Sequence, residues 1–153
     1  MFDLRAALLD FGAFHRTRGN RICHAIGLPS IAAAVLGALA HVRLPVVDVD
    51  AAVVLLALTL LLDLALNVRI AFGVLVFGSA LYFAARDLPW WALGALYAGG
   101  WIFQLVGHRG FEKNAPAFTQ NAKHLFVGPR WLVNRIVRAL PDQAPETRAD
   151  VAE

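Results

Sequence analysis

The chain has 153 residues, which suits a single domain, and 59% of them are hydrophobic, whereas soluble domains contain roughly 45–50% apolar residues. The net charge of +3 is small and the basic residues form no stripe, so nucleic-acid binding is not expected. Cys23 is the single cysteine, which excludes an intrachain disulfide and a cysteine-rich zinc site.

The N-terminal region predicts a short amphipathic helix over residues 3–17. Leu4, Leu8 and Phe11 recur there at helical spacing, and polar residues lie between them. We expect this helix to lie on a membrane surface. The region lacks the basic start, apolar middle and cleavage site that characterise a secretory signal peptide.

A break is expected between this helix and the first long apolar segment. Gly19-Asn20 interrupts the helical pattern, and Asn20 is a suitable N-cap for a helix that begins at Arg21. Pro29 has no amide hydrogen, so it leaves a carbonyl one turn earlier without its helical partner. Residues 20–28 are therefore predicted to form a separate helical turn set against the first span.

Four apolar segments follow with short connections and few charges, which is the pattern of membrane-spanning helices. The fold class predicted is all-α, an integral membrane four-helix bundle with amphipathic surface helices at both ends. The second surface helix is expected at 129–140, after a polar segment at 109–128, so 1–140 is one membrane domain and 141–153 a disordered tail. The predicted spans are about 28–42, 51–66, 70–85 and 88–107.

The distribution of Lys and Arg predicts the orientation of the spans. With four spans, both termini share one side with the 67–69 loop, and that side carries twelve Lys and Arg residues. The opposite side carries only Arg43 and Arg86. Both termini are therefore expected in the cytoplasm, in the bacterial inner membrane or in the endoplasmic reticulum of a eukaryote.

The histidines suggest a metal site. His15, His24, His108 and His124 all fall on the cytoplasmic side of this topology, from segments that are far apart in sequence, whereas His41 lies at the opposite side. His15 and His24 would point in opposite directions on one continuous helix, so their convergence needs a turn between them.

A second polar group follows the fourth span. Gln104, His108 and Glu112 are spaced four residues apart and share a face if the helix continues. Plainer roles are open at this point: interfacial polar side chains for the histidines, a helix cap for Asn20, and a surface ion pair for Glu112. Asp63 shares a helical face with Asn67 and either seals a helix end or touches the site.

Two stretches resemble one family. Residues 15–29 read H-x4-N-R-x2-H-x2-G-x-P, and residues 101–117 read W-x2-Q-x2-G-H-x2-F-E-x3-P-A. Together they resemble the small membrane family that contains the 2-hydroxy-palmitic acid dioxygenase of phytosphingosine breakdown. The resemblance implies Fe(II)-dependent α-oxidation, in which a 2-hydroxy fatty acid loses one carbon at the expense of O2.

Carried over residue by residue, the motifs imply that His15, His24 and His108 bind the metal. Asn20, Gln104 and Glu112 would support them and are our candidate catalytic residues. His124 lies outside the motifs and is a candidate fourth ligand. The arginines near the cytoplasmic ends of the spans would attract the substrate carboxylate: Arg16, Arg18, Arg21 and Arg109.

Two other functions are compatible with the sequence. One is a membrane hydrolase that holds Zn(II) at the same histidines and uses Glu112 as general base. The other is a non-catalytic membrane protein that binds lipid. The expected partners of the leading hypothesis are a 2-hydroxy fatty acid, O2 and the lipid bilayer, and the sequence leaves a homo-oligomer open. No Rossmann, P-loop or Gly-x-Ser-x-Gly signature is present.

Overall fold

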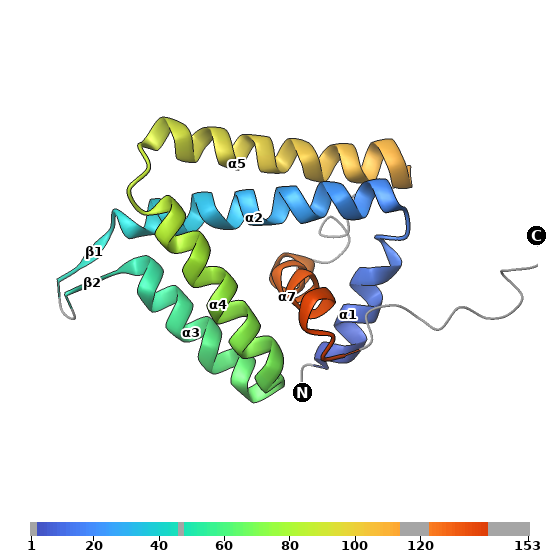
Figure 1. Cartoon of the computed structure of the whole chain (residues 1–153), viewed down its shortest axis with the longest axis horizontal. Helices are drawn as coiled ribbons and strands as arrows, with labels where there is room; N and C mark the ends of the chain where they lie inside the picture. Colours follow the sequence, from blue (N-terminus) through green and yellow to red (C-terminus); the bar gives the residue numbers. More distant parts are fainter. Residues whose placement is uncertain (1–2, 46–47, 114–122, 141–153) are drawn as a thin grey trace, which may run out of the picture.

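The computed structural model describes residues 3–45, 48–113 and 123–140, and most of them are helical (Figure 1). The described residues form six α-helices, one π-helix and one short hairpin. These elements are α1 Leu4–Ala13, α2 Arg18–Ala40, β1 Arg43–Leu44, β2 Val49–Asp50, α3 Ala51–Leu66, α4 Val68–Ala85, α5 Trp90–Leu105, η1 Val106–Glu112 and α7 Lys123–Val137.

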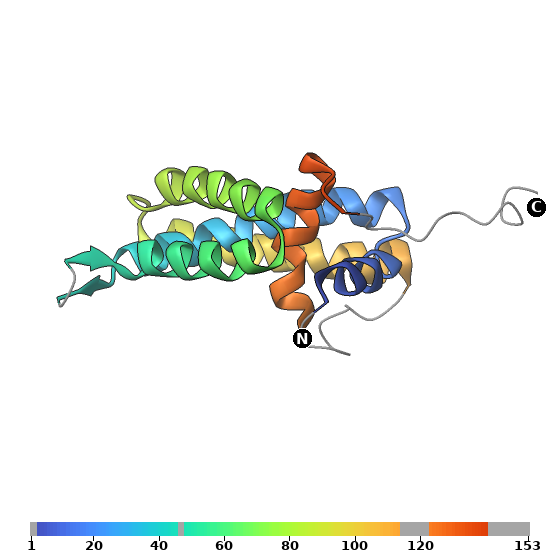
Figure 2. The ribbon, with the colours of Figure 1, turned by 90° about the horizontal axis from the view of Figure 1, so that it is seen from below.

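Helix α1 confirms the amphipathic pattern predicted at the N-terminus. Asp3 caps it by accepting a hydrogen bond from the amide of Ala6, and Leu8 and Phe11 are buried. The buried face packs on α7, which lies between α4 and α1 in Figure 1 and runs across the long helices in Figure 2. Trp131 of α7 joins this cluster, so the two terminal helices cover the same end of the molecule.

Helix α2 differs from the prediction. It is continuous from Arg18 to Ala40, so neither the separate turn at 20–28 nor a start at Arg21 is correct. Thr17 is the N-cap, and its hydroxyl oxygen accepts a hydrogen bond from the amide of Asn20. Pro29 lies inside the helix without ending it, because packing of α2 against its neighbours outweighs one lost backbone hydrogen bond.

Helices α2 and α5 lie side by side and antiparallel (Figure 1). Their backbones approach closely at Gly27 and Gly100. A Cβ on Gly27 would lie 2.7 Å from the Gly100 carbonyl oxygen, and a Cβ on Gly100 would lie 2.9 Å from that of Gly27. Small residues permit such contact between apolar helices, so this pair forms the rigid frame of the fold.

Helices α3 and α4 form an antiparallel pair beside α2 (Figure 1). Helix α3 matches the predicted span 51–66, and α4 begins two residues before the predicted 70–85 because Asn67 caps it through the amides of Arg69 and Ile70. The loop before α3 contains the antiparallel β1–β2 hairpin, in which Arg43 lies opposite Asp50 in the strand register.

Two helices, α2 and α4, are long and apolar enough to span a membrane, and α3 is a shorter apolar helix. Many large apolar side chains are exposed, which is unusual for a soluble monomer. The described surface includes Phe72, Val76, Phe83, Trp91 and Ile102 among them. These features give weak support to a membrane location, whereas the four-span bundle and its orientation remain predictions.

The C-terminal part also differs from the prediction. Helix α7 begins at Lys123, six residues before the expected start, and contains Pro129. The segment predicted to be polar and irregular, 109–128, is helical up to Glu112 and again from Lys123. The tail at 141–153 lies outside the described residues.

Candidate metal centre

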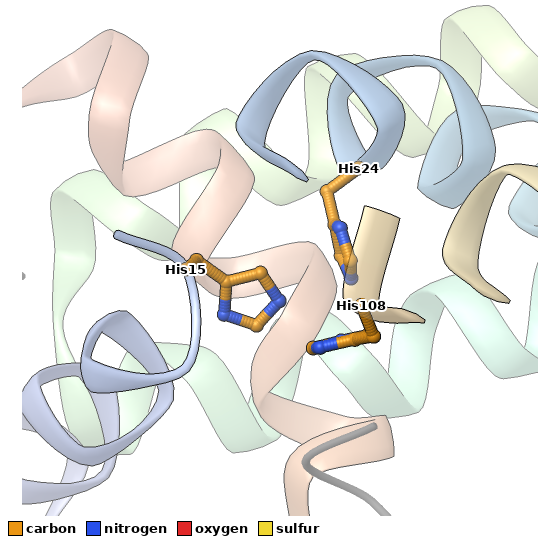
Figure 3. Close-up of side chains that lie close together, drawn as sticks. All are labelled: His15, His24 and His108. Carbon is orange, nitrogen blue, oxygen red and sulfur yellow. The ribbon is translucent and has the colours of Figure 1, made fainter. Parts of the chain in front are cut away.

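Three histidines from three different parts of the chain meet beside α7 (Figure 3). His15 lies between α1 and α2, His24 lies in α2, and His108 lies in η1. All three are at most 2% exposed, and one nitrogen of each lies within 4.8 Å of the others. The ring centroids are 4.1 to 4.9 Å apart. His15 and His24 can face each other because the chain turns between α1 and α2.

Backbone carbonyls fix the orientation of two of the rings. His15 donates from Nδ1 to the carbonyl oxygen of Phe11 over 2.6 Å, and His24 donates from Nδ1 to that of Asn20 over 3.0 Å. A carbonyl only accepts, so Nδ1 carries the proton and the lone pair is on Nε2. This arrangement is typical of metal-binding histidines, whose other ring nitrogen is held by an acceptor.

The cluster contains polar atoms that lack a partner among the described residues. His15 Nε2 and His108 Nδ1 are buried, and neither atom forms a hydrogen bond with any of the described residues. A buried polar atom without a partner costs free energy on the order of 1–3 kcal/mol, and binding of a ligand at these nitrogens would offset that cost. The donor set therefore fits a divalent transition metal that prefers imidazole, which includes iron and zinc.

Burial keeps these imidazoles neutral. Burial, together with repulsion from neighbouring His24 and His108, lowers the pKa of His15 to about 2, although the hydrogen bond to the Phe11 carbonyl opposes the shift. Burial also lowers the pKa of His108, although Glu112 opposes the effect. A metal ligand must be deprotonated, so at neutral pH both side chains are in the form that binds metal.

Glu112 ties η1 to the start of α2. Its Oε1 accepts hydrogen bonds from the Thr17 amide at 2.7 Å, the Thr17 hydroxyl at 3.0 Å and Asn20 Nδ2 at 3.3 Å. Burial opposes ionisation of Glu112, but these donors outweigh it and lower the pKa of the carboxyl group. Asn20 also donates to the carbonyl of Phe14, so the segment that carries His15 is held on both sides.

Helix α5 is followed directly by a π-helix, η1, which begins at the end of the fourth apolar segment and continues to Glu112. Such widened turns occur frequently at functional sites. Gly107 lies against α2, where a Cβ would overlap Asn20 Oδ1 and come within 3.0 Å of Cys23 Cβ. The glycine therefore lets η1 approach α2 closely enough for His108 to reach His15 and His24.

Gln104 is 5% exposed and lies beside His24, on the wall of a cavity that begins at the histidine cluster. His124 is buried next to the cluster but is not one of its three members. Its Nε2 lies 2.8 Å from Asp10 Oδ2, and its Nδ1 has no partner among the described residues. His41 lies away from the cluster, exposed beside Trp90.

A cavity of about 590 Å³ extends from the cluster into the helical bundle. Its volume is typical of a small-molecule site, for which roughly 300–1,000 Å³ is usual. His24, Gln104 and His108 lie at one end, and aliphatic side chains of α2, α3, α4 and α7 form most of the remaining wall. The arginines expected to attract a carboxylate, at positions 16, 18, 21 and 109, do not line it.

Arg130 does line the cavity, and the sequence analysis missed it. Its Nε donates to Asp63 Oδ1 over 2.6 Å, and Nη1 donates to the Phe126 carbonyl over 2.6 Å. Both members of the ion pair are at most 5% exposed. Asp63, an acid within an apolar segment, was the signal that a cation should lie nearby.

The comparisons with known proteins give one match. The sequence model of a family described as 2-hydroxy-palmitic acid dioxygenase Mpo1-like matches residues 1–140. These residues include the whole histidine cluster and both terminal helices. No curated protein and no solved structure has significant similarity to the chain.

Proposed function

Because the chain belongs to the Mpo1-like family, whose description implies dioxygenase activity on a fatty acid, we propose that it is an Fe(II)-dependent dioxygenase. It shortens 2-hydroxy fatty acids by one carbon with O2. The observation that carries the proposal is the buried group of three neutral imidazoles from three elements, with unpartnered ring nitrogens beside an apolar cavity.

In this proposal His15, His24 and His108 would hold the metal. Fe(II) held there would supply the redox chemistry with O2, which no side chain of the cluster can supply. Three neutral imidazoles bring no negative charge, so the site would favour an acid substrate whose carboxylate balances the charge of a dipositive ion. The 2-hydroxyl group offers a second oxygen donor.

The neighbouring residues orient the ligands. Asn20 and Phe11 present carbonyl groups to His24 and His15, and Glu112 holds the turn between α1 and α2 through Thr17. Gln104 lines the cavity beside His24, where it can position the head of a substrate. The apolar walls exclude water from the reacting end.

The same proposal places the protein in a membrane with four spans and both termini in the cytoplasm, as one domain over 1–140. The asymmetry of Lys and Arg supports it. Single cysteines added near residue 3 and near residue 150 should react with a membrane-impermeant reagent only from the cytoplasmic side. Labelling of either position from the other side of intact membranes would contradict the topology.

The chemical proposal is tested on the purified protein. After anaerobic purification it should contain iron, consume O2 with a 2-hydroxy fatty acid, and release the acid that is one carbon shorter. Because zinc displaces iron adventitiously, the metal analysis is paired with the O2 measurement. Stoichiometric zinc with hydrolysis and no O2 uptake, or no stoichiometric metal at all, would contradict the proposal.

One observation weighs against the zinc hydrolase. That mechanism needs Glu112 as a general base, yet its Oε1 already accepts hydrogen bonds from Thr17 and Asn20. A carboxylate held in this way has a lowered pKa and is a poor proton acceptor. The geometry therefore favours a structural role for Glu112.

A further inference from the structure

The cavity has a polar end and an apolar end. Three histidines and Gln104 form the polar end, and apart from Thr59 and Arg130 the rest of the wall is aliphatic, aromatic or glycine; the histidines are His24, His108 and His124. His24 and Leu36 both line the cavity and are twelve positions apart on α2, which corresponds to about 18 Å at about 1.5 Å per residue. The cavity is thus long as well as apolar.

The end of the cavity farthest from His24 is bounded where α2 meets α4. Leu36 and Leu81 line it there, and Leu81 packs against a cluster of Ala33, Ala85 and Leu93. At Gly37, the next residue of α2, a Cβ would lie 2.7 Å from the Ala85 carbonyl oxygen. Helices α2 and α4 are therefore in backbone contact just beyond Leu36, which limits the cavity between these two helices.

The side of the cavity between α2 and α3 is open. Five large apolar residues line the cavity and are also exposed at the surface. Four lie on α2 and α3, at 37% for Val35, 39% for Leu55, 55% for Leu58 and 56% for Leu62, and the fifth, Leu125 at 56%, lies on α7. The opening faces the surroundings of the bundle, which is the bilayer if α2 and α3 span it.

We propose that this groove between α2 and α3 binds the acyl chain of the substrate, which enters sideways from the bilayer, and that Leu36 and Leu81 set the longest chain accepted. The proposal rests on the proposed function for the head group at the histidines. An extended alkyl chain built from bonds of about 1.5 Å advances about 1.3 Å per carbon, so about 18 Å accommodates about 14 carbons. That is the tail of 2-hydroxypalmitate beyond its carboxyl and hydroxyl carbons, the acid in the family description.

The first experiment uses 2-hydroxypalmitate that carries a photoreactive diazirine near its terminal methyl group, with the full chain in nanodiscs. The label should attach at or next to Leu36 and Leu81, as mapped by mass spectrometry. A diazirine near the carboxyl end should instead label the segments of His24 and His108. Labelling concentrated on Val76 and Phe83, which are exposed apolar residues of α4 outside this cavity, would overturn the proposal.

The second experiment shortens the groove. Ala32 lines it eight positions after His24, so the Ala32→Trp side chain should block it about 12 Å from the cluster. We expect the variant to lose on the order of 10–200-fold in its preference for 2-hydroxypalmitate over an acid of half the length, measured by competition for photolabelling. Ala95→Trp, at an exposed position of α5, is the matched control and should keep the preference. An unchanged preference in Ala32→Trp would overturn the proposal.

If Ala32→Trp does not fold, Leu81→Ala makes the opposite change. It removes part of the end of the groove that Leu81 lines. An acid with a longer tail should therefore compete for photolabelling better on the variant than on the unmodified protein. No gain for that acid would overturn the proposal. Photolabelling does not require turnover. A protein that is labelled at Leu81 but neither binds iron nor consumes O2 would reject the proposed function and leave the groove assignment standing.

Discussion

The two ends of the helical bundle use their polar side chains differently. At one end α1, the start of α2, η1 and α7 bury His15, His24 and His108 together with their hydrogen-bond partners. At the other end the chain turns through a two-stranded hairpin, and His41 lies exposed beside Trp90. Both ends contain histidine, so the residue type alone does not mark the site.

The difference lies in how each polar group is held. Near the cluster, Glu112 and Asn20 connect segments that are more than ninety residues apart in sequence. At the hairpin end the polar contacts span less of the sequence: Tyr82 donates to Asp50 across 32 residues, and His41 Nε2 lies 3.2 Å from the Leu88 carbonyl oxygen across 47. The contacts with the largest separation therefore hold the end at which we propose the function.

The largest effect is expected from the three clustered histidines. His15→Ala, His24→Ala and His108→Ala each remove one of three metal ligands, so each variant should be free of metal and inactive. Metal content and turnover of a 2-hydroxy fatty acid measure this. His41→Ala is the matched control from the opposite end and should keep both metal and activity. Full iron occupancy in any one of the three would remove that residue from the ligand set.

Two features of the molecule could be predicted correctly from the sequence, the bounds of α3 and the convergence of three histidines. Helix α3 was predicted at its observed bounds, because a charge-poor run between Asp50 and Asn67 defines it locally. The three histidines were predicted to converge, and the cluster bears out that expectation. Both results depend on residue spacing and on motifs that can be read along the chain.

The incorrect predictions, at Pro29 and Asn20, arose where tertiary interactions outweigh the local signal in the sequence. Pro29 predicted a break, but close packing of α2 on α5 keeps the helix continuous. Asn20 was expected to cap a helix; Thr17 does so, and the Asn20 side chain reaches Phe14 and Glu112. No local pattern predicts these contacts, since their partners come from other elements.

The second-largest effect is expected from the buried ion pair at the cavity. Arg130→Met leaves Asp63 charged and uncompensated, which should lower the free energy of unfolding by about 3–5 kcal/mol. The double variant Asp63→Leu with Arg130→Met removes both charges and should recover most of the loss. Thermal and denaturant unfolding in detergent measure it. A single variant as stable as the unmodified protein would show that the pair is not buried.

A smaller effect is expected from Glu112. Glu112→Ala removes the acceptor of three hydrogen bonds from Thr17 and Asn20, so metal affinity should fall on the order of 10–100-fold while some activity remains. Glu112→Gln keeps an oxygen acceptor and should lose less. Metal titration of both variants compares them. If Glu112→Gln abolished turnover at full metal occupancy, the carboxylate would take part in the reaction itself.

The smallest effect at this end is expected from His124, which the sequence suggested as a fourth ligand. Its Nε2 is already held by Asp10 at 2.8 Å, and it lies outside the group of three histidines. His124→Ala should therefore keep its metal and lose only the contact between α1 and α7, with a cost of about 1 kcal/mol in the free energy of unfolding. Asp10→Asn is the matched control, because it weakens the same contact without touching the imidazole. Loss of metal from His124→Ala but not from Asp10→Asn would make His124 a ligand, and the comparison between the two ends would then rest on four histidines against one.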